Sequence, residues 1–74
     1  MNYDAYRNGK SFGESNVRTY GLLETARVLK AAQQCARTRR ERFEWLQGFA
    51  VAVALAAAER GVALGALVDE VRHG

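Results

Sequence analysis

The chain contains no proline, one cysteine, one histidine and one tryptophan among its 74 residues. Because proline is the strongest helix breaker, its absence permits long helices throughout. The single cysteine excludes an intrachain disulfide, and one cysteine with one histidine gives no metal-ligand spacing. No stretch alternates polar and apolar residues over the length of a strand. We therefore expect an all-α protein that uses no metal or other cofactor.

Long hydrophobic runs are also missing. The most apolar stretch, from Trp45 to Ala58, is interrupted by Gln47 and Gly48 and is shorter than the roughly 20 residues needed to cross a membrane. The N-terminus is polar and lacks the apolar region of a signal peptide. Eleven Lys and Arg against eight Asp and Glu give a net charge of +3, which suits an acidic partner but is far below the density of a dedicated nucleic-acid arm. These features predict a cytoplasmic protein that does not enter a membrane.

Four helical segments are expected within one domain spanning residues 1–74. From Leu22 onward the sequence is rich in Ala, Leu, Arg, Glu and Gln, which are strong helix formers. Ser15 or Asn16 can cap the second helix, and Gly61 follows the third as its C′ glycine. The expected elements are a short or partly ordered N-terminal helix over 1–15, a helix over 16–37, a helix over 38–60 and a short helix over 63–73.

The region around residues 36–39 leaves two arrangements open. Thr38 followed by Glu41 fits a capping box that opens a new helix and gives a helical hairpin. Neither glycine nor proline interrupts residues 30–47, so a single helix over 16–60, about 67 Å long, is the alternative. Such a helix would bury its apolar faces only in a dimer. We favour the hairpin, as part of a small three-helix protein.

The segment Phe49–Ala58 has no polar side chain. Its bulky members point in four directions around a helix: Phe49, Val51, Val53 and Leu55. A helix that is apolar on all sides must be covered on all sides. A chain this short buries only about 60% of the surface that its unfolded form exposes, and small domains commonly gain stability by oligomerisation. We therefore expect a homodimer and assign these four residues to a dimer or partner interface.

A second pattern predicts close packing between helices. Trp45 and Gly48 lie on one helix face, and the glycine costs about 1 kcal/mol of helix propensity relative to alanine, which suggests a close backbone approach. Gly9 and Gly13 are four residues apart and would supply a matching flat face. The N-terminal helix is expected to cross against Trp45 and Gly48, with simple packing around one tryptophan as the alternative.

Catalytic chemistry has little support in the sequence. His73 lies one residue from the C-terminus, and Cys35 has basic neighbours at Arg37 and Arg39 but no evident partner base. The carboxylates are scattered, and no glycine-rich phosphate loop follows a strand. We therefore expect no enzymatic activity and no catalytic residues.

Basic residues between the second and third helices are the candidate nucleic-acid contacts: Arg37, Arg39, Arg40 and Arg42. On a helix these four project at widely different angles and form a collar. Glu41 and Glu44 halve the net charge over residues 37–44. A solvated helix junction is therefore favoured over contact with RNA or DNA.

Residues 57–72 resemble a helix-turn-helix, in which Ala57 precedes the turn glycine Gly61 by four positions. Arg60 and Glu70 occupy positions that are normally apolar in that motif. An exposed face with Asp69 and Glu70 would be repelled by phosphate. DNA binding by this region is therefore less favoured than a regulatory role or RNA binding.

The pattern R-x-x-W-L-x-G-[FW]-x-x-A, preceded by G-x-x-x-G, resembles the bacterial ribosome modulation factor, a family of small basic helical proteins of ribosome hibernation. The Cys-Pro-Tyr segment of that family is missing here, and the interval between the two halves is longer. The same pattern is also similar to helical hairpins of small plasmid and phage regulators, including antagonists of transcription activators. The matching residues are Gly9, Gly13, Arg42, Trp45, Leu46, Gly48, Phe49 and Ala52.

Taken with the composition, these patterns predict a small, non-enzymatic regulatory protein. We expect it to self-associate and to bind and modulate or inhibit a larger protein partner, such as a transcription activator, through helical surfaces. The alternative, implied by the resemblance, is a ribosome- or RNA-binding protein that uses the four arginines.

Overall fold

The computed structural model describes residues 3–35 and 40–73, which form four α-helices and no strand. The all-α class expected from the composition is confirmed, and the described residues form four helices, as many as the expected helical segments. They are α1 (Tyr3–Tyr20), α2 (Leu22–Cys35), α3 (Arg40–Glu59) and α4 (Leu64–His73).

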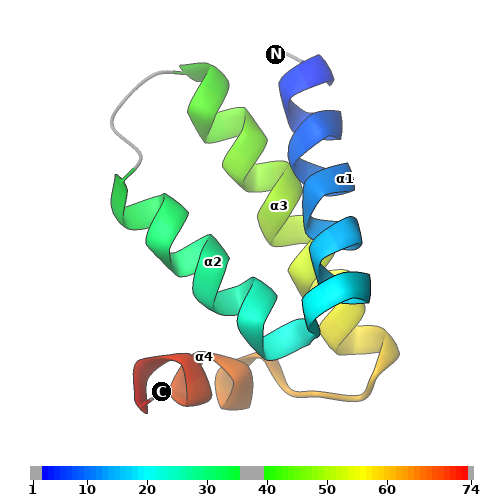
Figure 1. Cartoon of the computed structure of the whole chain (residues 1–74), viewed down its shortest axis with the longest axis vertical. Helices are drawn as coiled ribbons and strands as arrows, with labels where there is room; N and C mark the ends of the chain where they lie inside the picture. The colour runs from blue at the N-terminus through cyan, green and yellow to red at the C-terminus, as the bar shows by residue number, and fades with distance from the viewer. Residues whose placement is uncertain (1–2, 36–39, 74) are drawn as a thin grey trace.

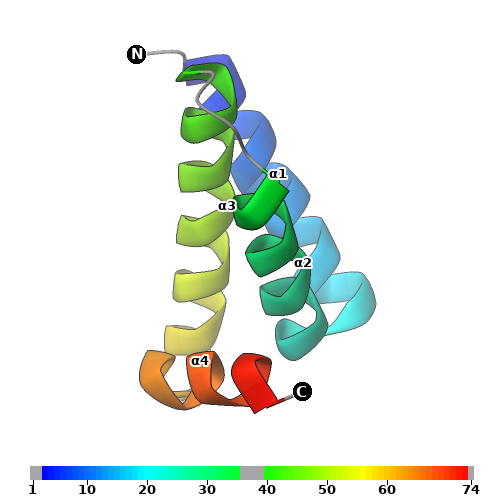
Figure 2. The same ribbon diagram turned by 90° about the vertical axis from the view of Figure 1, so that its left-hand side faces the viewer.

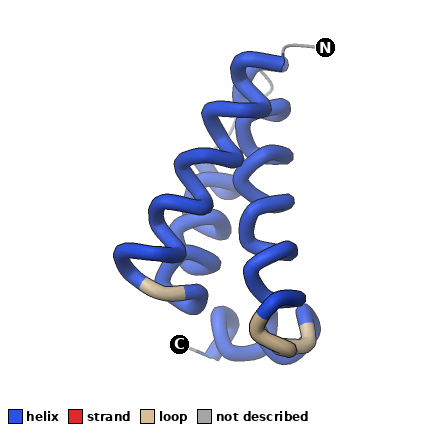
Figure 3. Tube along the Cα trace, turned by 90° about the vertical axis from the view of Figure 1, so that its right-hand side faces the viewer, coloured by secondary structure: helices blue, strands red, loops and turns tan. Residues whose placement is uncertain are grey.

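The first and third helices form the main pair of the fold. α1 and α3 run in the same direction and make the most extensive helix contact among the described residues, while α2 runs in the opposite direction (Figure 1). Figure 2 shows that α1 and α3 separate toward the end of α1, and that α4 lies across the ends of α2 and α3. The two described loops lie at this same end of the molecule (Figure 3).

The core lies where α2 and α4 pack against the second half of α3. The buried apolar side chains that form it are Val17, Leu22, Ala26, Phe49, Val53, Ala57 and Leu67. Thr25 is also fully buried, and its hydroxyl donates a hydrogen bond to the carbonyl oxygen of Gly21 at 2.7 Å. The core is therefore small and drawn from all four helices, with its one fully buried hydroxyl satisfied by the backbone.

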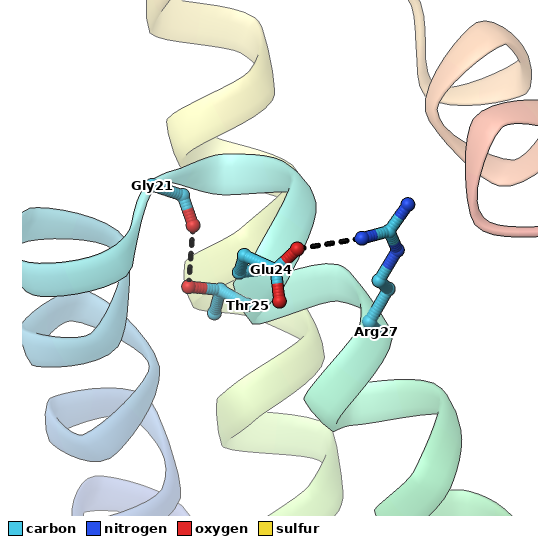
Figure 4. Close-up of polar contacts among 4 residues, drawn as sticks. All are labelled: Gly21, Glu24, Thr25 and Arg27. Atoms are coloured by element: carbon cyan, nitrogen blue, oxygen red, sulfur yellow. Dashed lines mark hydrogen bonds and ion pairs between the residues drawn. The ribbon is translucent and has the colours of Figure 1, made fainter. Parts of the chain in front are cut away.

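One glycine separates α1 from α2 and reverses the chain. Gly21 has a φ of +89°, in the region that side chains with a Cβ rarely adopt. Its N–H donates to the carbonyl of Val17 at 3.0 Å, which closes α1 in an αL motif. Its carbonyl accepts bonds from the backbone N–H and the hydroxyl of Thr25, which start α2 (Figure 4). A surface ion pair of 2.6 Å between Glu24 and Arg27 adds little stability to this turn.

The expected boundary between the first two helices is wrong. The sequence placed it near Ser15 or Asn16, whereas α1 continues through both residues to Tyr20. Asn16 does not cap a helix, because its side-chain amide donates to the carbonyl of Phe12 one turn earlier, at 2.8 Å. The positive φ at Gly21 ends α1, and this backbone effect outweighs the capping preference of the two earlier residues.

The alternative of one long helix over 16–60 is excluded, because α2 and α3 are separate helices that run in opposite directions (Figure 1). The bend itself, expected near 36–39 with Thr38 as its cap, lies outside the described residues. Contacts between α2 and α3 show that the two helices pack against each other.

The turn between α3 and α4 forms as the glycine pattern predicts. Gly61 has a φ of +67°. Its N–H donates to Ala58 at 3.1 Å, and the N–H of Val62 donates to Ala57 at 2.9 Å, which is the bond pattern of a Schellman motif. The turn directs α4 back across the molecule, so that Leu67 reaches the core.

Replacing Gly21 with alanine should lower the free energy of unfolding by about 1–2 kcal/mol, because the left-handed backbone is strained for a residue with a Cβ. No atom lies within 4 Å of a Cβ built at this position, so the cost is confined to the backbone. Urea unfolding at one fixed protein concentration measures it.

Gly65→Ala is the matched control, because Gly65 lies in α4 without a positive φ and also has open space around it. Alanine there should raise stability by up to about 1 kcal/mol. Equal stability of Gly21→Ala and the wild type would contradict this role of Gly21.

Candidate functional site

The closest contact between helices is made by two glycines that lie against backbone. A Cβ built at Gly9 would overlap the carbonyl oxygen of Trp45, and one built at Gly48 would overlap the carbonyl oxygen of Tyr6. The α-hydrogen of each glycine therefore points at a carbonyl oxygen of the other helix, the arrangement of Cα–H···O contacts at close helix crossings. The contact is reciprocal, because each helix contributes one glycine and one carbonyl.

One turn further along, the crossing is slightly wider. A Cβ at Gly13 would lie 2.8 Å from the Cβ of Ala52 and 3.2 Å from the ring of Phe49. The structure thus brings together all four residues of the expected packing face, Gly9, Gly13, Trp45 and Gly48. They form an intrachain contact between α1 and α3.

Three aromatic rings cover one side of this crossing. Phe12, Trp45 and Phe49 have ring centroids 5.2 to 5.4 Å apart, and Phe49 meets both of the others edge to face. Such tilted and edge-to-face pairs are favourable arrangements of aromatic quadrupoles. Phe49 is completely buried, whereas Phe12 remains 42% exposed. The cluster therefore holds α1 and α3 together from the side that faces the core.

The expected interface of Phe49, Val51, Val53 and Leu55 needs correction. Phe49 is 0% and Val53 3% exposed within a single chain. The other three helices supply more cover than their lengths suggested, because α2 and α4 both pack against this part of α3. Neither side chain is free to contact a partner. Val51 is half-buried and Leu55 is 49% exposed, so these two remain accessible.

The accessible side of α3 forms a continuous uncharged strip, here termed the outer face of α3. At 100° per residue its members lie within about 100° of the helix circumference. All of them are exposed or half-buried, and Phe43 is 60% exposed. They are Phe43, Gln47, Ala50, Val51, Ala54 and Ala58. No other described element covers this strip.

A second apolar surface is a groove of about 280 Å³ between α2 and α4, here termed the α2–α4 groove. Three buried side chains, Ala26, Val53 and Leu67, lie at its base. Its walls and rim are more exposed and consist of Leu29, Lys30, Gln33, Leu64, Val68, Val71 and Arg72. The groove is thus an apolar channel with a cation on each of its two helices.

A hollow of similar size between the ends of α1 and α3 has a different character. It is lined largely by side chains of both charges, including Lys10, Glu14, Arg18, Glu59 and Arg60. Three cations alternate with two carboxylates in this hollow, which therefore offers neither a continuous apolar surface nor a field of one sign.

Of the four candidate nucleic-acid arginines, the structure places Arg42, whose side chain is exposed on α3. Arg37 and Arg39 lie outside the described residues, and Arg40 begins α3 with its side chain outside the description. The other described Lys and Arg side chains lie on α1, α2 and α4 and at Arg60, directly after α3.

The region that resembles a helix-turn-helix is sharply bent between α3 and α4. α3 from Arg42 and α4 meet at 113°, within the range of about 90–120° for that motif. The apolar row of α4 faces the α2–α4 groove, while Asp69 and Glu70 are exposed away from it. The surface that would have to approach phosphate is therefore the acidic one.

Within residues 3–35 and 40–73, no group of three or more His, Cys, Asp and Glu side chains is placed to hold a metal ion. His73 is exposed at the end of α4. None of the described helices is by itself long and apolar enough to span a membrane, and only α3 and α4 taken together, with their sharp bend, meet those measures.

No family model matches the chain, and no curated protein or solved structure matches it with significant similarity. The resemblance to ribosome modulation factor therefore rests on the motif residues alone. Several of these residues, Gly9, Gly13, Trp45, Gly48 and Phe49, form the α1–α3 crossing, where they pack the helices together.

Gly9→Ala and Gly48→Ala should each lower the free energy of unfolding by about 1–3 kcal/mol, because the added methyl meets backbone that cannot move aside. Helix propensity alone would raise the free energy of unfolding, since alanine is favoured over glycine within a helix. Urea unfolding followed by Trp45 fluorescence reports both stability and the packing of the crossing.

Ser11→Ala is the control on α1, because Ser11 is exposed and away from the crossing. It should change stability by less than about 0.5 kcal/mol. A neutral or stabilising effect of both glycine substitutions would show that the backbones do not approach as described.

Proposed function

We propose that this chain is a small, non-enzymatic regulatory protein that forms a homodimer and, as a dimer, binds and modulates a larger protein. The observation that carries the proposal is the outer face of α3, which is uncharged and accessible over four turns of the central helix. Exposed apolar strips of this kind mark interaction surfaces in soluble proteins.

The accessible area of the chain supports self-association. A folded monomer of 8.2 kDa is expected to expose about 4,500 Å², whereas this chain exposes 5216 Å². The excess, about 700 Å², is close to the roughly 800 Å² that each partner buries in a standard protein interface.

The shape of the strip suits a helix of the same kind. Ala50, Ala54 and Ala58 follow one another at intervals of four residues, so a second α3 can approach closely along them. A two-fold axis through this strip would bring the same residues of both chains together, which is the arrangement of most homodimers. Phe43 and Leu55, both about half exposed or more, would flank the contact.

The separation of two surfaces supports the proposed modulating role. The outer face of α3 and the α2–α4 groove lie on different sides of α3, so a dimer formed on the first leaves the second accessible for a larger protein. The ribosome- or RNA-binding alternative is supported only by Arg42 among the described side chains, and we treat it as an outcome of the binding experiment below.

Ala54→Glu should convert the dimer to a monomer, because two carboxylates would be brought together without a partner in the interface. The side chain is exposed within one chain, so the monomer should keep its fold. Sedimentation equilibrium should give twice the 8.2 kDa chain mass for the wild type and the single chain mass for the variant. Circular dichroism should show unchanged helix content.

Ala31→Glu is the matched control, since Ala31 is an exposed alanine on α2. It should remain a dimer. A wild-type protein that stays monomeric at high concentration, or equal dissociation by both substitutions, would overturn the proposed homodimer.

A further inference from the structure

We infer that the α2–α4 groove binds an acidic amphipathic helix of the larger partner. This inference rests on the proposed function and specifies the chemistry of the segment that the partner contributes. It assigns a surface that lies apart from the outer face of α3.

The dimensions of the groove favour a helix as its occupant. At about 280 Å³ it lies at the lower limit of small-molecule pockets, which are about 300–1,000 Å³ and enclose their ligands. This groove is only partly enclosed, so it would leave part of a small molecule exposed to solvent. A helix laid in a groove inserts only the side chains of its apolar face, spaced at i, i+3, i+4 and i+7.

The wall formed by α4 has this same spacing. Leu64, Leu67, Val68 and Val71 form an i, i+3, i+4, i+7 row, of which only Leu67 is buried by the chain itself. Leu64 is 54% and Val68 43% exposed. The exposed members of the row are therefore available to pack against the apolar face of another helix.

The charges around the groove indicate which side chains should flank the apolar face of the bound helix. Lys30 from α2 and Arg72 from α4 line the groove, and no carboxylate does so. Among the described side chains, neither cation makes an ion pair. The carboxylates of the same two helices, Glu24, Asp69 and Glu70, are exposed and do not line it.

This distribution gives a positive rim with the negative side chains turned elsewhere. Opposite charges across an interface steer association and fix register, whereas like charges disfavour the wrong partner. A helix with Glu or Asp beside its apolar face complements the rim, and a basic helix does not. Nucleic acid would meet the same cations, but the apolar walls between them would remain exposed to water.

Two synthetic peptides of about five helical turns provide the test. Both carry leucines at i, i+3, i+4 and i+7, and one is flanked by glutamates where the other has lysines. Each is titrated into the ¹⁵N-labelled full-length protein at low salt, and backbone amide shifts are followed by NMR. The acidic peptide should bind, with shifts concentrated on α2 and α4, and the basic peptide should bind at least about tenfold more weakly.

Charge reversal on the rim separates specific contact from general attraction. The double variant Lys30→Glu/Arg72→Glu should bind the acidic peptide at least about tenfold more weakly than the wild type does. It should bind the basic peptide more tightly. The control Lys10→Glu/Arg18→Glu changes the net charge equally on α1, outside the groove, and should leave the affinity within about threefold. Val68→Asp should also abolish binding, since Val68 is exposed and its substitution leaves the core intact.

Several results would overturn the inference: no binding of the acidic peptide at millimolar concentration, equal affinity for both peptides, or shifts centred on the outer face of α3. Single-stranded RNA that binds the groove more tightly than the acidic peptide would also overturn it and favour the nucleic-acid alternative. The Ala54→Glu monomer distinguishes the two proposals. If that variant binds the acidic peptide, the groove is a binding site whether or not the chain forms a homodimer. If the wild-type protein is a dimer but does not bind the acidic peptide, the proposed binding site is wrong and the proposed homodimer stands.

Discussion

The backbones of α1 and α3 touch at Gly9 and Gly48, where no side chain larger than hydrogen fits. This contact fixes how closely the two parallel helices approach each other. Parallel neighbours require a returning segment, and α2 supplies it after the reversal at Gly21. Where α1 and α3 separate, α2 and then α4 fill the space, so the position of every helix depends on the one glycine-mediated crossing.

The same crossing determines which side of α3 remains accessible. Because Trp45 and Phe49 are turned toward α1 and the core, the opposite side of the helix is directed outward. Three alanines and Val51 lie there without a covering element. The groove between α2 and α4 arises independently, because α4 crosses the ends of α2 and α3 and leaves its apolar row half exposed. One small chain thus presents an uncharged strip and a basic-rimmed groove on different sides.

Local features of this arrangement can be predicted from the sequence. Which neighbouring helix buries a given side chain cannot. The spacing of Gly9 and Gly13 and the position of Gly48 within a helix indicate close packing. Gly61 ends α3 because a left-handed residue is needed there. Gly21 acts in the same way but follows a stretch where capping residues suggested an earlier boundary. Periodicity gives the direction of Val53 on its helix but not the neighbour that covers it. The groove combines Lys30 with residues some forty positions later, and only the tertiary arrangement brings them together.

We propose that a second copy of the chain covers the outer face of α3 in solution. The most direct measurement is an isotope-filtered NOE experiment on a mixture of ¹³C-labelled and unlabelled protein, which detects contacts between chains only. Intermolecular NOEs are expected from the methyl groups of Ala50, Ala54 and Ala58, and none from Gly9 or Gly48. Intermolecular NOEs confined to α2 and α4, or their absence at concentrations where the protein is fully associated, would contradict it.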